Sequence, residues 1–188
     1  MKSKKLMSVI VAIIIIAVIA GGSYYAYHYE TTGTMKVSAA DTPTNLIGVM
    51  DVNVTFSAIA LHSDKVSSNS TGWTNYSLHD KTVNIMNLNA SNAAFLSNLS
   101  VHAGSYNLIK IYIKNVTIYV NTSVTSLFGA NATVSLHLAH DFALVVLVHP
   151  VTVSAHSTTS IVTDFNLSNN IHVSSHTFSM SATVDVVS

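Results

Sequence analysis

The stretch VMDVNVTFSAIALH, residues 49–62, decides the fold class, because apolar side chains occupy every second position from Met50 to Ala58. Successive side chains of a β-strand point to opposite faces of its sheet, so this period of two predicts a strand with one buried face. The apolar face comprises Met50, Val52, Val54, Phe56 and Ala58.

The chain on both sides of this strand repeats the same kind of segment: short, rich in Val, Ile and Thr, and bounded by turn residues. The further predicted strands are 34–40, 73–78, 81–88, 105–120, 132–138, 142–149, 151–155, 160–167 and 177–187. Amphipathic helices do not intervene, so the pattern favours an all-β, antiparallel β-sandwich over an α/β fold.

Three local features modify this scheme. Asn89–Leu99 is predicted to be the one short helix of the domain, with Phe95, Leu96 and Leu99 on one face. A bulge or bend is expected near Lys114, because the apolar positions change parity there. Phe142–Val148 is apolar at successive positions, which is typical of a central strand covered on both faces.

The N-terminal segment predicts where the domain lies. LMSVIVAIIIIAVIA, residues 6–20, follows three lysines, and basic residues before an apolar segment stay in the cytoplasm. As a helix this run covers roughly 22 Å, and roughly 36 Å when the tyrosine-rich residues up to Tyr29 are included. Residues 1–29 are therefore predicted to be a single transmembrane anchor in the cell membrane, with residues 30–188 as an ectodomain outside it.

A cleaved signal sequence is the alternative, because Val18-Ile19-Ala20 offers small residues where a signal peptidase reads. A pilin-type signal is disfavoured, since the residues after Lys5 lack the small residue that such processing needs. Thr31–Gly33 is expected to form a short linker to the ectodomain.

Composition excludes several classes of function. The chain has no cysteine, which removes disulfides, thiolate metal sites and cysteine nucleophiles. It has no arginine, and the residues beyond Glu30 include five lysines and seven aspartates. No basic surface for nucleic acid is therefore expected. The ten histidines would make the ectodomain positive near pH 6, which suits acidic surroundings.

Several motifs are shared with a known family. They are Asp41-Thr-Pro43, Val52-Asn-Val-Thr-Phe56, Gly72-Trp73, Val83-Asn-Ile-Met-Asn-Leu88, Ala103-Gly-Ser-Tyr106 and Asp164-Phe-Asn-Leu167. On these residues the chain resembles the domain-of-unknown-function 4382 (DUF4382) family, which comprises secreted or membrane-attached β-sandwich domains of archaea and bacteria. The resemblance implies an extracytoplasmic domain and carries over no catalytic residue.

Glycosylation is the strongest functional signal. The chain contains nine Asn-x-Ser/Thr sequons, about double the roughly four that its composition would give by chance. The candidate asparagines are Asn53, Asn69, Asn75, Asn89, Asn98, Asn115, Asn121, Asn131 and Asn166. Asn53 and Asn115 are expected on the outward faces of their strands.

Other candidate sites are weak. His137, His140 and Asp141 resemble a ligand cluster, but residues 137 and 140 of one strand point to opposite faces. His172 and His176 share a face but lie about 13 Å apart, too far for one ion. Trp73 is expected to pack rather than to form a carbohydrate platform.

No metal, cofactor or catalytic site is predicted. The chain lacks a nucleophile elbow and a glycine-rich phosphate loop, and it has no glutamate beyond Glu30 for glycoside chemistry. A serine triad assembled from distant residues stays open.

These observations together predict a non-enzymatic structural or adhesion module of the cell envelope. It is expected to be membrane-anchored and N-glycosylated, and to contact other envelope proteins or copies of itself. One alternative is an extracellular filament, in which the residues from Gly21 onward add as a strand to the next subunit after cleavage. The other is an exported solute- or metal-binding domain, which would show a deep pocket.

Overall fold

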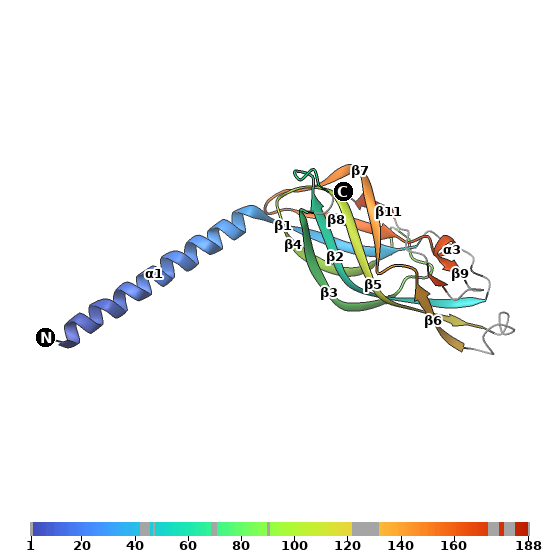
Figure 1. Cartoon of the computed structure of the whole chain (residues 1–188), viewed down its shortest axis with the longest axis horizontal. Coiled ribbons are helices and arrows are strands. Elements are labelled where there is room, and N and C mark those ends of the chain that lie inside the picture. The colour runs from blue at the N-terminus through green and yellow to red at the C-terminus, as the bar shows by residue number, and fades with distance from the viewer. Residues whose placement is uncertain are drawn as a thin grey trace.

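A long helix leads directly into a domain of β-sheets (Figure 1). The structure is a computed structural model that describes residues 2–41, 46, 48–68, 71–89, 91–121, 132–172, 177–178 and 183–187. Helix α1 spans Lys2–Thr31, and a second, short helix, α3, spans Leu167–Asn170. The strands are β1 (Thr32–Ala40), β2 (Val49–Ser63), β3 (Trp73–Asn84), β4 (Ala94–His102), β5 (Gly104–Val120), β6 (Ala132–Leu138), β7 (Phe142–Val153), β8 (Thr158–Asp164), β9 (Ile171–His172), β10 (Thr177–Phe178) and β11 (Thr183–Val187).

The strands form two sheets. The smaller has the order β11-β8-β1-β4, and the larger has the order β3-β2-β5-β6-β10-β9. Strand β7 pairs with the N-terminal part of β5, while β6 pairs with its C-terminal part. Most pairs are antiparallel, although β1 with β8 and β6 with β10 are parallel. The predicted all-β sandwich with one short helix is thereby confirmed.

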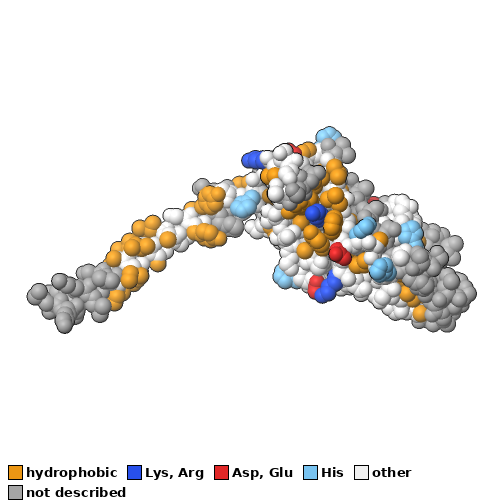
Figure 2. All heavy atoms as spheres, viewed as in Figure 1, with side chains coloured by type: hydrophobic (Ala, Val, Ile, Leu, Met, Phe, Trp, Pro, Cys, Tyr) orange, Lys and Arg blue, Asp and Glu red, His pale blue; other side chains and the backbone are white. Residues whose placement is uncertain are grey.

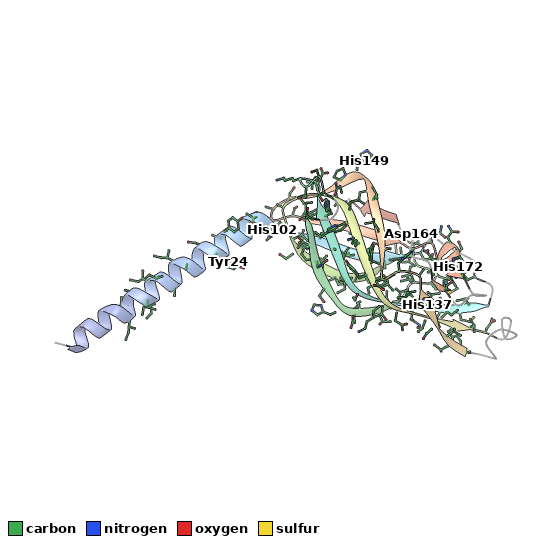
Figure 3. The ribbon with its side chains drawn as sticks, in the orientation of Figure 1. Tyr24, His102, His137, His149, Asp164 and His172 are labelled. Carbon is green, nitrogen blue, oxygen red and sulfur yellow. The ribbon has the colours of Figure 1, made fainter. Side chains whose placement is uncertain are left out.

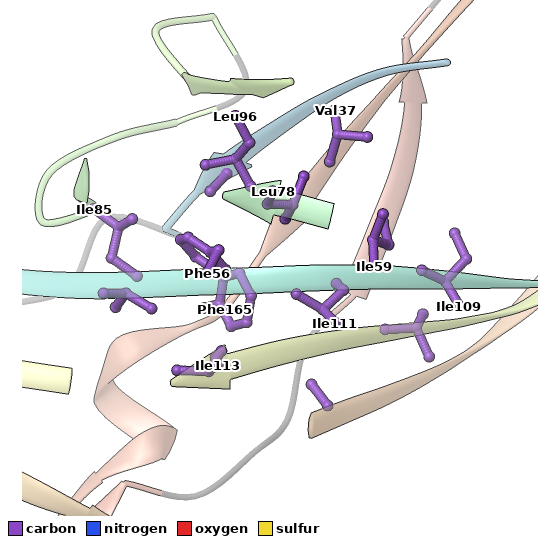
Figure 4. Close-up of a cluster of buried hydrophobic side chains, with 14 of the residues drawn as sticks. Val37, Phe56, Ile59, Leu78, Ile85, Leu96, Ile109, Ile111, Ile113 and Phe165 are labelled. Carbon is purple, nitrogen blue, oxygen red and sulfur yellow. The ribbon is translucent and has the colours of Figure 1, made fainter. Parts of the chain in front are cut away.

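The core between the sheets comes from the inward positions of this alternating pattern. Phe56 of β2 lies against Phe165, with ring centroids 5.4 Å apart, and isoleucines of β2 and β5 extend the cluster along the sheet (Figure 4). Burying such side chains contributes roughly 1.5–3 kcal/mol each. The chain has no cysteine, so no disulfide adds to the stabilisation that this cluster provides.

The predicted bulge in β5 is confirmed. Thr55 pairs with Asn115 and Phe56 pairs with Ile113, so Lys114 has no opposite residue on β2. The extra residue restores the parity, and both Ile113 and Val116 are buried. Similar shifts occur in β2, and one of them turns Met50 outward, contrary to its predicted inward position.

The predicted helix over Asn89–Leu99 is wrong, because Ala94–His102 forms strand β4 against β1. A register shift places Leu96 between the two paired residues Ser97 and Phe95, so that Leu96 and Leu99 are both buried three positions apart. This bulge therefore imitates helical spacing. The Asn89 side chain accepts bonds from the amides of Ser91 and Asn92, which closes a turn before the strand.

Two strand predictions also differ in their limits. The segments 73–78 and 81–88 belong to one strand, β3, which is interrupted at His79 and Asp80, both at positive φ. The segments 142–149 and 151–155 likewise form one strand, β7, with a register shift beside Pro150.

Two predicted strands near the C-terminus have different limits in the structure. The predicted strand 160–167 corresponds to β8, which ends at Asp164 before α3 begins. The predicted strand 177–187 contains the separate strands β10 and β11, and residues 179–182 lie outside the described part.

The prediction that Phe142–Val148 is a covered central strand is wrong. In the described residues β7 pairs with β5 alone, and Leu144 and Val146 are 48% and 69% exposed. The apolar outward positions thus form surface rather than core.

The predicted linker Thr31–Gly33 is also wrong, since α1 ends at Thr31 and β1 begins at Thr32. A Cβ atom on Gly33 would lie 2.3 Å from the Ser154 carbonyl oxygen. Glycine is therefore required here because two backbone segments approach closely, not because the chain is flexible.

Candidate functional site

The end of the domain beside α1 is built from three segments that meet at the last turn of the helix. We call it the anchor-adjacent end and define it by Thr32, Ala103 and His156. The Ala103 amide donates to the Thr31 carbonyl oxygen (2.7 Å), and the His156 amide donates to that of Thr32 (3.0 Å). Figure 3 shows His102 at this end, and His137 and His172 at the opposite end of the domain.

The described middle part of helix α1 is not covered by the domain. Its segment Ile10–Tyr27 is long and apolar enough to cross a membrane, and none of it is buried in the domain. Tyr24, Tyr25 and Tyr27 are exposed near its C-terminal end, where an interfacial aromatic belt would lie. The helix is therefore a signal sequence or a single membrane span.

A small cavity opens at the anchor-adjacent end; we call it the Lys65 pocket. Its volume is about 210 Å³, and its polar lining residues are Ser63, Lys65, Thr74, His102, Ser105 and Tyr106. The Tyr106 hydroxyl donates to the His102 carbonyl oxygen (2.7 Å), and the Asp64 amide donates to that of Ser105 (2.9 Å). The motif Ala103-Gly-Ser-Tyr106 thus builds this part of the molecule.

Burial changes the acidity of two tyrosines in the domain. Burial, together with the neighbouring Tyr106, raises the pKa of Tyr76 to about 12. Burial also raises the pKa of Tyr106. Both side chains consequently stay uncharged at neutral pH, and Tyr106 acts at the pocket wall as a hydroxyl donor.

A second cavity, of about 250 Å³, lies across the start of β1. Hydroxyl-bearing residues and His156 line it, and His156 has a positive φ of 59°. This second cavity thus adjoins the strand that continues α1, whereas no residue of β1 lines the Lys65 pocket.

The sequon asparagines spread over the surface. Asn75, Asn89, Asn98 and Asn115 are exposed, whereas Asn53, Asn121 and Asn166 are partly buried. Asn69 and Asn131 lie outside the described residues. Asn89 and Asn166 also accept bonds within their own turns, from Ser91 and Ser168.

The histidines named as metal candidates are not brought into a cluster. His137, His140, Asp141 and His172 are exposed, and the described ranges contain no group of three His, Asp or Glu residues that could hold an ion. Strand register pairs both His137 and His172 with residue 177, which places them two strands apart, about 10 Å. His176 lies outside the described residues.

Sequence reasoning missed His62, whose side chain is fully buried. Its Nδ1 bonds to Oδ1 of Asn107 (2.8 Å), and its Nε2 bonds to the carbonyl oxygen of Ser68 (3.0 Å). The register shifts in β2 change the parity before His62, and the loop after the strand folds over its ring.

Trp73 packs in the same region, as predicted. Its ring lies 5.0 Å from that of His62, and the Lys110 ammonium is 4.1 Å from its centroid and 5.1 Å from that of Phe142. With Leu144 and Val146, these side chains form an apolar outer face around one basic residue (Figure 2).

Asp41, the described residue of the first family motif, meets the motif Asp164-Phe-Asn-Leu167 in space. Asp41 is buried, and its Oδ1 accepts from the amide of Leu167 (2.8 Å) at the start of α3. Asp164 accepts from the amide of Asn166 (3.0 Å), and the Asn170 amide group donates to the Phe165 carbonyl oxygen. These bonds join the end of β1 to the end of β8.

Comparison with known proteins gives one result. A family model described as "Domain of unknown function (DUF4382)" matches residues 32–181, which is nearly the whole β domain. Neither a curated protein nor a solved structure matches the chain.

Proposed function

The chain belongs to the DUF4382 family, and from this premise we propose that it is a non-enzymatic structural or adhesion module of the cell envelope. In this proposal α1 is a single membrane pass, and the β domain is N-glycosylated outside the cell membrane. Its partners are other envelope proteins or further copies of the chain.

The exposed helix is the observation that carries the proposal. Removing apolar surface from water yields roughly 25 cal/mol per Å², and the apolar side chains of Ile10–Tyr27 obtain none of this from the domain. A bilayer supplies the missing burial, and the preceding lysines favour a cytoplasmic N-terminus.

Fractionation of cells that express the full chain tests the anchor. We expect the protein to stay with membranes in alkaline carbonate, its β domain to be digested by protease added to intact cells, and N-terminal sequencing to recover the first residues. A protein in the medium that begins at Gly21 would contradict anchoring and favour the secreted form.

The exposed sequons support glycosylation. The transferred glycan requires an accessible Asn side chain on an exported domain, and Asn75, Asn98 and Asn115 are exposed on strands. Mass spectrometry of native protein should find glycans at these three positions first. Bare asparagines at all of them would reject this part of the proposal.

The alternatives draw less support from the structure. The cavities described above, of about 210 and 250 Å³, are below the roughly 300–1,000 Å³ of a typical small-molecule site. The residues from Gly21 to Thr31, which strand donation would need in extended form, are helical here.

A further inference from the structure

The Lys65 pocket lies at the height of lipid headgroups if α1 spans the membrane. Thr31 is the fourth residue after Tyr27, the end of the apolar segment, a rise of about 6 Å. The headgroup layer is about 5–8 Å thick on each side of a bilayer. The amide of Ala103, a residue of the pocket wall, bonds to the Thr31 carbonyl oxygen.

The chemistry of the pocket suits an anion. Lys65 provides an ammonium group and His102 a ring N–H donor, and no acidic residue lines the cavity. Among the described residues neither side chain has an ion-pair or hydrogen-bond partner. Asp64 is the nearest acidic residue along the chain, and it is exposed outside the lining.

Hydroxyl groups complete the donor set. Ser63 and Ser105 lie on the wall beside these two groups. Hydrogen bonds to a charged acceptor contribute about 1.5–3 kcal/mol each, more than bonds between neutral groups. The cavity is too small for a drug-sized ligand, which favours a compact group such as phosphate.

We propose that the Lys65 pocket binds the phosphate group of a membrane lipid, with Lys65 and His102 as the principal donors. The proposal rests on the anchoring proposed above. It assigns to the anchor-adjacent end a second, headgroup-specific contact with the bilayer, in addition to the helix.

Nanodiscs that contain the full chain provide the test. One set is made of phosphatidylglycerol and the other of an uncharged glycolipid without phosphate, and amide hydrogen exchange is followed at residues 64–66 and 102–104. Inorganic phosphate is added to the glycolipid discs as a third arm. The variants are Lys65→Gln and His102→Gln, with Lys81→Gln on β3 as the matched control, because Lys81 is exposed and outside the pocket.

We expect exchange to be about tenfold slower in phosphatidylglycerol, the effect of about 1.4 kcal/mol, and this protection to be lost in Lys65→Gln and kept in Lys81→Gln. Equal protection by inorganic phosphate would support the pocket and assign the free anion as its ligand. Exchange that is the same in all three arms, or protection that Lys81→Gln loses equally, would overturn the proposal.

A failure of the anchor would be visible separately. In that case the chain does not enter the discs at all, and inorganic phosphate added to the protein in detergent still tests the pocket.

Discussion

His62 illustrates how a single polar residue can hold an outer loop against a sheet. It is fully buried although it points to the outer face of β2, because the chain from Ser63 to Ser68 closes over it. Both ring nitrogens have partners, the Asn107 side chain and the Ser68 carbonyl. The ring therefore serves the fold, and it is unavailable as a metal ligand or a base.

His62→Ala should destabilise the full chain by about 2–4 kcal/mol, because it creates a cavity at a fully buried position and removes the bonds to Asn107 and Ser68. His137→Ala, at an exposed position of β6, should change stability by no more than about 0.5 kcal/mol. Urea unfolding of both variants measures the difference, and equal effects would contradict the structural role.

The raised pKa of Tyr76 predicts that the folded chain loses stability at alkaline pH. Burial raises its pKa to about 12 in the folded chain, from an ordinary value of 10.0. The folded state thus favours the neutral phenol, so the contribution is fully present below pH 10 and is lost as the pH rises from 10 towards 12.

Tyr76→Phe should flatten this part of the pH profile, because phenylalanine has no proton to lose. Urea unfolding at pH 8, 10 and 11.5 would show a smaller decline for the variant than for the wild type. An identical decline in both proteins would mean that another group causes it.

At the scale of elements, the junction between α1 and β1 depends on Gly33. Its position leaves no room for a side chain beside Ser154 and Val153, whereas nothing lies within 4 Å of a Cβ placed on Gly104. The two glycines lie at the same end of the domain, but only Gly104 has room for a side chain.

Gly33→Ala should lower stability by about 2–3 kcal/mol, because backbone atoms have to move apart. Gly104→Ala should leave stability unchanged or raise it by up to about 1 kcal/mol, since alanine restricts the unfolded chain. Thermal unfolding of the two variants in the same detergent checks this, and a neutral Gly33→Ala would refute the close approach.

The regular strands were predictable from sequence, since alternation over residues 49–62 and the parity change at Lys114 directly reflect burial on one face. The helix prediction over Asn89–Leu99 was wrong because a bulge places the buried residues Leu96 and Leu99 three positions apart, as a helix does. The prediction that both faces of β7 are covered was wrong because the sequence does not reveal whether another layer packs on a sheet.

The site was less predictable than the fold. Sequence indicated the sequons and the separate motifs, but the Lys65 pocket combines residues from β2, the following loop and the turn between β4 and β5. Such a combination depends on strand pairing over long separations, which composition and periodicity do not contain. His62 was missed for the same reason.

At the scale of the whole molecule, two sequons lie on strands that end a sheet. β3 ends the larger sheet and β4 ends the smaller one, and Asn75 and Asn98 are exposed on these strands. Unpaired edge strands invite pairing with other chains unless something covers them. Glycans at these positions would cover both edges.

In a host that glycosylates the protein, the double variant Asn75→Gln/Asn98→Gln should therefore aggregate more on heating than Asn115→Gln, whose site is on the interior strand β5. Light scattering at matched concentration measures this. The prediction fails if Asn115→Gln aggregates as much as the double variant.

If α1 spans a membrane as proposed, its direct passage into β1 leaves no flexible linker between the membrane and the domain. Transmembrane helices tilt by about 20° on average as bilayer thickness varies. If β5, with 17 residues, spans about 55 Å, such a tilt would displace a point at that distance by nearly 20 Å. Local membrane thickness would then set the lateral reach of the β domain.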